Sequence, residues 1–68
     1  MSMPKTLEEL AQMIANRDGI SYREGLAAVR DCAAELELAF MNGSVTEAED
    51  ILREDLGIEP DYLDLFIF

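Results

Sequence analysis

Apolar residues recur every three or four positions along three stretches of the chain, which is the spacing of an amphipathic α-helix. The first stretch predicts a helix over residues 7–16, and the second predicts a long helix over 22–42. The third predicts a helix over 45–56, after which Pro60 suits the first turn of a short helix over 60–66. No stretch alternates with the period of two that is typical of β-strands. The pattern therefore predicts an all-α single domain, a small bundle of three main helices plus a short C-terminal helix, with 22–42 as the long central helix.

Helix start and stop signals alternate along the chain in the order that these boundaries require. A Ser/Thr-x-x-Glu capping pattern begins at Thr6, Ser21 and Ser44. In such a pattern the hydroxyl accepts an early helical N–H and the glutamate reaches back. A glycine suited to the left-handed conformation that ends a helix follows each of these three helices. These glycines are Gly19, Gly43 and Gly57.

The long helix over 22–42 carries two apolar faces. The first repeats with heptad spacing, and its members are Tyr22, Leu26, Val29, Ala33, Leu36 and Phe40. Small residues beside this row would let another helix approach closely; they are Gly25, Cys32 and Ala39. The second face consists of Ala27, Ala34, Leu38 and Met41. Two such faces predict either a central helix that is contacted on both sides, or one face for the core and one for a dimer.

The predicted core draws on all three main helices. Its members are Leu7, Leu10, Ile14, Leu26, Val29, Leu36, Phe40, Ile51, Leu52 and Leu56. We also expect Val45 and Ala48 to face inward, and Ile58 to fold back on Leu52 after the third helix ends. The segment 62–68 is apolar except at Asp64, so it has to pack somewhere. It either docks on its own bundle or inserts into a partner.

Charge is divided unevenly between the two halves of the chain. Fifteen acidic residues oppose five basic ones, which gives a net charge of −10. Residues 1–34 hold five acids and four bases, whereas residues 35–68 hold ten acids and Arg53 alone. Phosphate would be repelled by the second half, so we expect no direct binding of nucleic acid or of an anionic membrane. A partner protein with a basic surface would be attracted.

Acidic residues of the third helix and the segment after it form a candidate binding surface, here called the acidic face. Its members are Glu47, Asp50, Glu54, Asp55, Glu59 and Asp61. The first three stand three and four positions apart, opposite the apolar side of the helix. Such neighbours lie about 5–6 Å apart, not far from the spacing of phosphates along a DNA strand. A groove of Lys and Arg side chains that binds nucleic acid could accept this face; the alternative is a solvated face that only keeps the protein soluble.

The residue types on which most catalytic and metal sites depend are missing or isolated. The chain has no His and a single cysteine, Cys32, and it contains no Gly-rich phosphate loop, Cys-x-x-Cys pair or calcium loop. We therefore expect no catalytic residue, cofactor or metal, and a small buried hydrophobe at Cys32. The N-terminus has no apolar run and no stretch is long enough to span a membrane, so the lone thiol favours the reducing cytoplasm.

Segments 18–24 (DGISYRE), 48–52 (AEDIL) and 55–63 (DLGIEPDYL) resemble short acidic helical proteins of phages and other bacterial mobile elements. This resemblance implies a context, because small acidic proteins of such elements often inhibit host defence. They include anti-CRISPR and anti-restriction proteins, some of which mimic DNA. Segment 42–52 (NGSVTEAEDIL) is similar to the last turn and third helix of ubiquitin-associated domains. The chain lacks the Met-Gly-Phe/Tyr loop with which those domains bind, so we interpret this second similarity as shared helix capping.

These observations favour a non-enzymatic protein-binding module with two alternative surfaces. In the first interpretation, the acidic face occupies a basic nucleic-acid-binding site on a host defence protein, as a DNA mimic. In the second, the chain is a helical adaptor or a homo-oligomer that binds through the long helix and the apolar tail. The candidate residues of this apolar surface are Leu38, Met41, Tyr62, Phe66 and Phe68.

Overall fold

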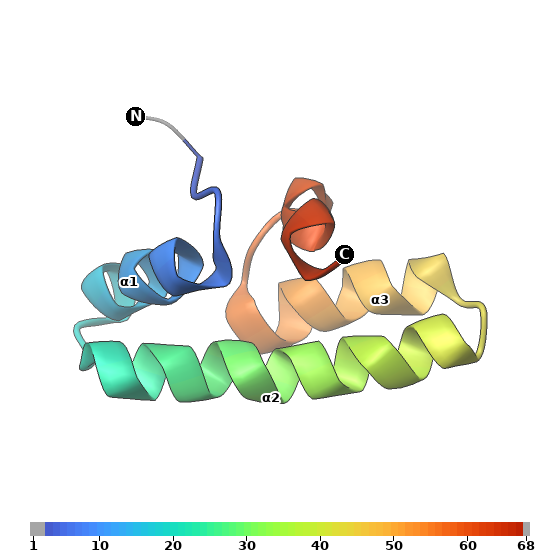
Figure 1. Cartoon of the computed structure of the whole chain (residues 1–68), viewed down its shortest axis with the longest axis horizontal. Coiled ribbons are helices and arrows are strands. Elements are labelled where there is room, and N and C mark those ends of the chain that lie inside the picture. The colour runs from blue at the N-terminus through green and yellow to red at the C-terminus, as the bar shows by residue number, and fades with distance from the viewer. Residues whose placement is uncertain (1–2, 68) are drawn as a thin grey trace.

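The computed structural model describes residues 3–67, which form helices joined by short connections (Figure 1). Its elements are α1 (Leu7–Asp18), α2 (Tyr22–Met41), α3 (Val45–Ile51), η1 (Leu52–Leu56) and η2 (Pro60–Phe66). The segment η1 is a π-helical continuation of α3, and η2 is a 3-10 helix. No strand occurs within residues 3–67, and the predicted all-α class is confirmed there.

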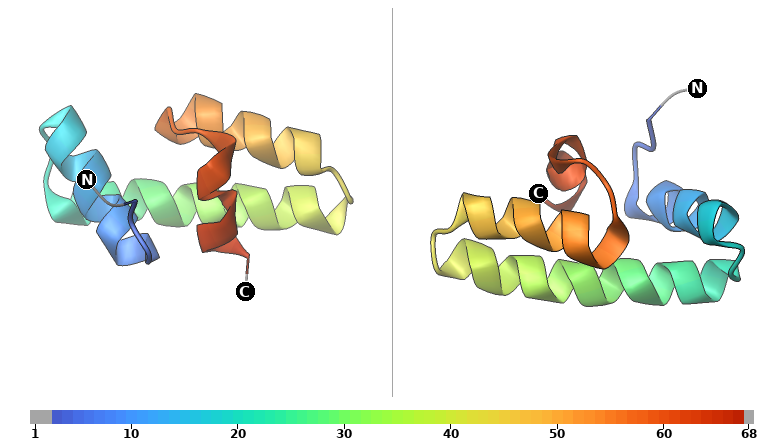
Figure 2. Two further views of the ribbon diagram at one scale, coloured as in Figure 1. Left: turned by 90° about the horizontal axis from the view of Figure 1, so that it is seen from above. Right: turned by 180° about the vertical axis from the view of Figure 1, so that it is seen from behind.

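The long helix α2 is the element on which the others are assembled. It packs against α1, α3 and η1, and α3 runs back beside it as an antiparallel neighbour (Figure 2). In the view of Figure 1, α1 lies above the first part of α2, and η2 lies above α3. Within the described part of the chain, the opposite side of α2 has no helix on it.

Hydrogen bonds at the helix starts confirm the predicted capping residues. The hydroxyls of Thr6 and Ser44 each accept the N–H three residues further on, at 3.1 and 3.2 Å. The reciprocal capping box forms at Ser21, where the hydroxyl accepts the Glu24 N–H at 3.1 Å and the Glu24 carboxylate accepts the Ser21 N–H at 3.2 Å. These bonds satisfy N–H groups that have no partner inside the helix.

Glycines end the helices in the predicted left-handed conformation. Their φ angles are 68° at Gly19, 72° at Gly43 and 64° at Gly57. The helix boundaries differ from the predicted ones by one or two residues: α1 ends at Asp18, two residues late, and α2 ends at Met41, one residue early. The short fourth helix covers the predicted range 60–66 but has 3-10 geometry.

The predicted helix over 45–56 changes its geometry halfway. The α-helical part stops at the start of η1, and the chain continues as a π-helix. Ile58 folds back as predicted: its N–H donates to the Leu52 carbonyl at 3.4 Å, and the Gly57 N–H donates to the Arg53 carbonyl at 3.0 Å. Each bond spans one residue more than in a Schellman end, because a π-helical turn holds an additional residue.

The buried row of α2 is not the row that the large apolar residues predict. The buried residues are Gly25, Val29, Cys32, Leu36 and Ala39. Only Val29 and Leu36 belong to the predicted heptad row. Tyr22 is exposed, and the remaining members are half-buried at the edge of the core: Leu26, Ala33 and Phe40. The small residues that the sequence places beside the row therefore form its centre.

A close crossing of α1 and α2 explains this shift. A Cβ atom on Gly25 would lie 2.5 Å from the carbonyl oxygen of Ala11 and 3.3 Å from the Cβ atom of Ala15. The two helices therefore approach to a distance that only glycine permits at this position. The close approach predicted from the small residues is confirmed, and it turns the smaller side chains of α2 inward.

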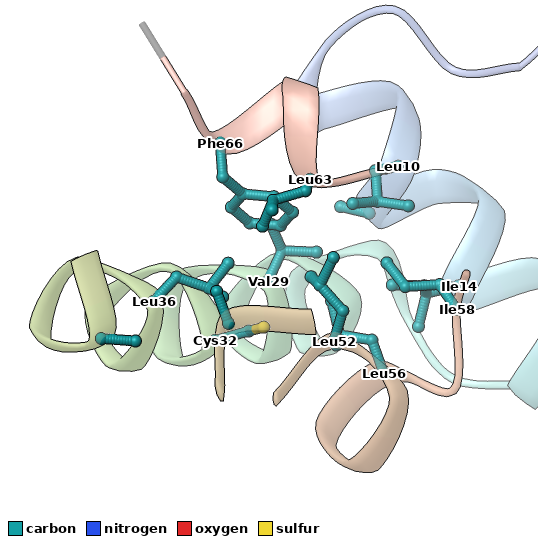
Figure 3. Close-up of a cluster of buried hydrophobic side chains, with 13 residues drawn as sticks. Leu10, Ile14, Val29, Cys32, Leu36, Leu52, Leu56, Ile58, Leu63 and Phe66 are labelled. Atoms are coloured by element: carbon teal, nitrogen blue, oxygen red, sulfur yellow. The ribbon is translucent and has the colours of Figure 1, made fainter. Parts of the chain in front are cut away.

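One cluster of buried side chains joins all the elements (Figure 3). Its large members are Leu10, Ile14, Val29, Leu36, Leu52, Leu56, Ile58, Leu63 and Phe66. Leu7 and Ile51 pack at its edge, whereas Val45, expected to face inward, is 59% exposed at the start of α3. Leu63 and Phe66 show that the C-terminal segment docks on its own bundle.

Candidate functional site

All six residues of the acidic face are exposed to solvent. The helix α3 begins after Ser44, whose hydroxyl accepts a hydrogen bond from the N–H of Glu47. Ala48 and Leu52 then point into the core with no exposed surface. Because these two residues fix the inner side of the helix, Glu47, Asp50 and Glu54 lie on the side that faces solvent.

The structure divides the acidic face into three parts. The first three carboxylates share the outer side of α3 and η1. Asp55 turns toward α2, where its side chain meets that of Glu35. Glu59 and Asp61 follow the reversal of the chain at Gly57, and η2 crosses above α3 at a steep angle (Figure 2). The acidic face therefore does not continue in a straight line beyond the third helix, as the sequence suggested, but bends after Gly57.

Ion pairing leaves most of this face uncompensated. Two ion pairs occur within residues 3–67, one between Arg17 and Asp18 and one between Arg53 and Asp50. The second is the only one that involves the acidic face. Its N–O distance is 3.8 Å and both side chains are more than half exposed, so it contributes little to stability.

A pair of carboxyl groups, Glu35 of α2 and Asp55 of η1, lies where the two helices meet. Hydrogen bonding to Asp55 raises the pKa of Glu35 above its ordinary value, and the negative charges of Asp55 and Asp31 raise it further. Beneath them, burial raises the pKa of the Cys32 thiol to about 12, and both carboxylates add to that shift. The thiol is fully buried, as predicted, and stays protonated at neutral pH. Sequence analysis missed the carboxyl pair because its members come from different helices.

Glu35→Gln is expected to stabilise the fold slightly at pH 7. Because the folded-state pKa of Glu35 is raised, the folded state binds this proton more tightly than the unfolded chain. Stability from this group is present at low pH and is lost as the pH rises through the raised pKa. Glutamine removes the charge while its amide can still donate to Asp55. Thermal unfolding followed by circular dichroism at pH 7 and at about pH 5 measures the effect.

Glu37→Gln is the matched control. It removes the same charge from the same helix, but two positions along a helix place it on the opposite flank of α2 from Glu35. We expect Glu35→Gln to show the larger gain at pH 7 and the flatter pH dependence. Equal behaviour of the two variants would contradict the interaction between Glu35 and Asp55.

The fold also divides the alternative apolar surface. Leu38 and Met41 are 62% and 76% exposed on α2. Phe66 is buried in the core, and Tyr62 is half-buried with its hydroxyl 3.8 Å from the sulfur of Met13. Phe68 lies outside the described residues. In residues 3–67, the exposed part of the predicted apolar surface is therefore on α2.

A groove of about 520 Å³ opens between the start of α1, α2 and η2. Its lining residues are Leu7, Ala33, Leu36, Glu37, Phe40, Met41 and Phe66. Ala33 and Phe40 belong to the predicted heptad row, and Phe40 also to the predicted core. They line the groove because the close crossing at Gly25 turns the neighbouring row of α2 inward. The small residues of that buried row, such as Gly25, are the sequence signal from which the buried side of α2 could have been predicted.

The described residues offer few other kinds of site. No group of three or more acidic, His or Cys side chains within residues 3–67 could hold a metal ion. None of the helices in this range combines the length and the apolar character that crossing a bilayer requires.

Comparison with known proteins adds no assignment to these surfaces. The chain matches no protein-family model, no curated protein and no solved structure. The acidic face and the exposed apolar residues of α2 are the features from which its function has to be inferred.

Proposed function

We propose that this protein is a non-enzymatic binding module that presents its acidic face to a basic surface of a partner protein. The supporting observation is that all six carboxylates are exposed. Within residues 3–67 only one of them, Asp50, has an ion-pair partner, and this pair with Arg53 is weak. Such a surface repels phosphate and attracts basic groups. It steers a basic partner toward the second half of the chain rather than toward residues 1–34, where five acids are nearly balanced by four bases.

The partner class that fits this face is a protein whose basic groove binds nucleic acid. Carboxylates one helical turn apart, at about 5–6 Å, offer such a groove a row of negative charges like that of a phosphate backbone. The resemblance to acidic proteins of phages and other mobile elements supports a bacterial defence protein as this partner. The chain then acts in the cytoplasm as an inhibitor that occupies the site of the nucleic acid.

Reversing two charges, Glu47→Lys together with Asp50→Lys, is expected to abolish binding to this partner while the helical content stays unchanged. Both side chains are exposed and neither contacts the core, so the fold should tolerate the change. The measurement is capture of proteins from bacterial lysate on the immobilised chain, with elution by rising salt or by added DNA. A partner of the proposed class is a nucleic-acid-binding protein that moderate salt or competing DNA releases.

Glu8→Lys together with Asp31→Lys is the control, because it changes the net charge equally at exposed positions outside the acidic face. We expect this control to retain the partner. Capture that survives reversal at Glu47 and Asp50 would overturn the proposal. Equal loss in both double variants would show that net charge alone, and not the acidic face, attracts the partner.

The exposure of Leu38 and Met41 favours a second candidate function, that of a helical adaptor that docks through α2. Binding of this kind resists salt, because it depends on apolar contact. Leu38→Glu would then abolish it, whereas reversal at Glu47 and Asp50 would have little effect.

A further inference from the structure

The turn between α2 and α3 contains an asparagine followed by a glycine, Asn42 and Gly43. It lies at one end of the molecule, away from α1 and η2 (Figure 1). Both residues are exposed, and a Cβ atom placed on Gly43 would meet no other atom within 4 Å. Solvent therefore reaches this turn, and no packed side chain crowds the glycine.

An asparagine that precedes a glycine can lose its side-chain amide without an enzyme. The backbone nitrogen of Gly43 gives up its proton to water or hydroxide and attacks Cγ of Asn42. The new N–Cγ bond closes a five-membered succinimide ring, while the Cγ–Nδ2 bond breaks and the amide nitrogen leaves as ammonia with a proton from water. Water then opens the ring at either carbonyl, which gives aspartate or isoaspartate. Glycine favours the attack because it has no Cβ atom beside the attacking nitrogen.

The folded turn opposes closure of this ring. The N–H of Gly43 donates to the Phe40 carbonyl at 3.0 Å, which occupies the attacking nitrogen. The N–H of Ser44 donates to the Ala39 carbonyl, also at 3.0 Å. The ψ angle of Asn42 is −1°, so the next nitrogen eclipses that of Asn42 itself, whereas the ring requires it to lie on the side of Cβ. Attack therefore requires the turn to open, and exposed connections open at a low free energy.

Two related positions in α1 lack this reactivity. Asn16 is followed by Arg17, whose side chain crowds the backbone nitrogen, and its own amide oxygen accepts a hydrogen bond at 3.0 Å from one turn back along the helix. Asp18 does precede a glycine, but its hydrogen bond with Arg17 holds the pKa of Asp18 below its ordinary value. An ionised carboxylate resists attack by an amide nitrogen. The Asn-Gly pair is therefore the reactive one.

We propose that Asn42 is a site of spontaneous deamidation whose rate is controlled by opening of the turn between α2 and α3. The reaction adds a carboxylate to a chain whose net charge is already −10. The new charge lies at the C-terminal end of α2, where the helix dipole disfavours it. The isoaspartate product also lengthens the backbone by one carbon atom, so the hydrogen bonds from Gly43 and Ser44 to α2 cannot both be kept. Modified chains therefore hold α3 less firmly against α2.

Incubation of the full chain at about pH 8, followed by peptide mass spectrometry, tests this site. The readout is the mass increase that accompanies conversion of an amide to an acid. We expect Asn42 to convert at least about tenfold faster than Asn16 in the same folded molecules. We also expect it to convert roughly tenfold to a hundredfold more slowly than in the chain unfolded by urea. Equal rates at Asn42 and Asn16 in the folded chain would overturn the site, and equal rates with and without urea would overturn its control by the turn.

Two capping variants test whether opening of this particular turn matters. Ser44→Ala removes the hydroxyl that accepts the Glu47 N–H at 3.2 Å, so the turn opens more often and deamidation at Asn42 should accelerate about fivefold. Thr6→Ala removes the equivalent cap of α1, a bond of 3.1 Å, and should leave the rate unchanged. Circular dichroism confirms that both variants are folded at the start. Equal acceleration in the two variants would contradict control by the turn between α2 and α3.

Discussion

Phe66→Ala should leave the chain largely unfolded at 37 °C. Phe66 is 8% exposed and packs in the buried cluster together with Leu63. Truncation of a buried phenylalanine to alanine costs about 3–5 kcal/mol, while the core of so small a domain supplies about 3–5 kcal/mol of net stability. The two quantities are of equal size, so the loss of this one side chain is enough to shift the equilibrium to the unfolded state.

Ile67→Ala provides the matched control for Phe66→Ala. Ile67 is the next residue, is equally apolar and is 54% exposed, so its truncation should change the free energy of unfolding by less than about 0.5 kcal/mol. Urea unfolding followed by circular dichroism compares the two variants. If Phe66→Ala were as stable as Ile67→Ala, the C-terminal segment would not be docked, and its apolar residues would be available to a partner.

The boundaries of the helices could be predicted from the sequence because they depend on local interactions. The hydroxyl of Ser21, the carboxylate of Glu24 and the left-handed glycines act within a few residues of the helix ends, whatever the rest of the chain does. The exposure of the acidic carboxylates was predictable for a similar reason. An ionised side chain is almost never buried without a partner, and the chain has too few bases to provide one.

The buried row of α2 could not be predicted from the sizes of its side chains. The heptad of large residues that includes Leu26 and Phe40 suggests the core, yet the close crossing at Gly25 decides which side of the helix is buried. The π-helical turn of η1 could not be predicted either, because no local signal in the sequence specifies its additional residue. The carboxyl pair of Glu35 and Asp55 depends on this packing as well, since the junction of two helices brings its members together.

Gly25→Ala is expected to destabilise the protein, although it improves the intrinsic helix propensity of α2. In an exposed helix interior this replacement would stabilise by about 1 kcal/mol. Here the new Cβ atom would lie 2.5 Å from the carbonyl oxygen of Ala11. That oxygen belongs to the backbone, so the clash is relieved only if α1 moves away from α2. Overpacking of this kind costs about 1–3 kcal/mol, and the loss of contact around Leu10 and Ile14 adds to it.

Ala27→Gly measures the propensity term by itself, because Ala27 lies exposed on the same helix. We expect it to lower the free energy of unfolding by about 1 kcal/mol, as the loss of helix propensity requires. If packing did not matter at Gly25, Gly25→Ala would raise the free energy of unfolding by the same amount. A decrease in both variants, measured by urea unfolding at micromolar concentration, is possible only if α1 contacts α2 at Gly25. An increase for Gly25→Ala would contradict the close crossing and, with it, the assignment of the small residues of α2 to the core.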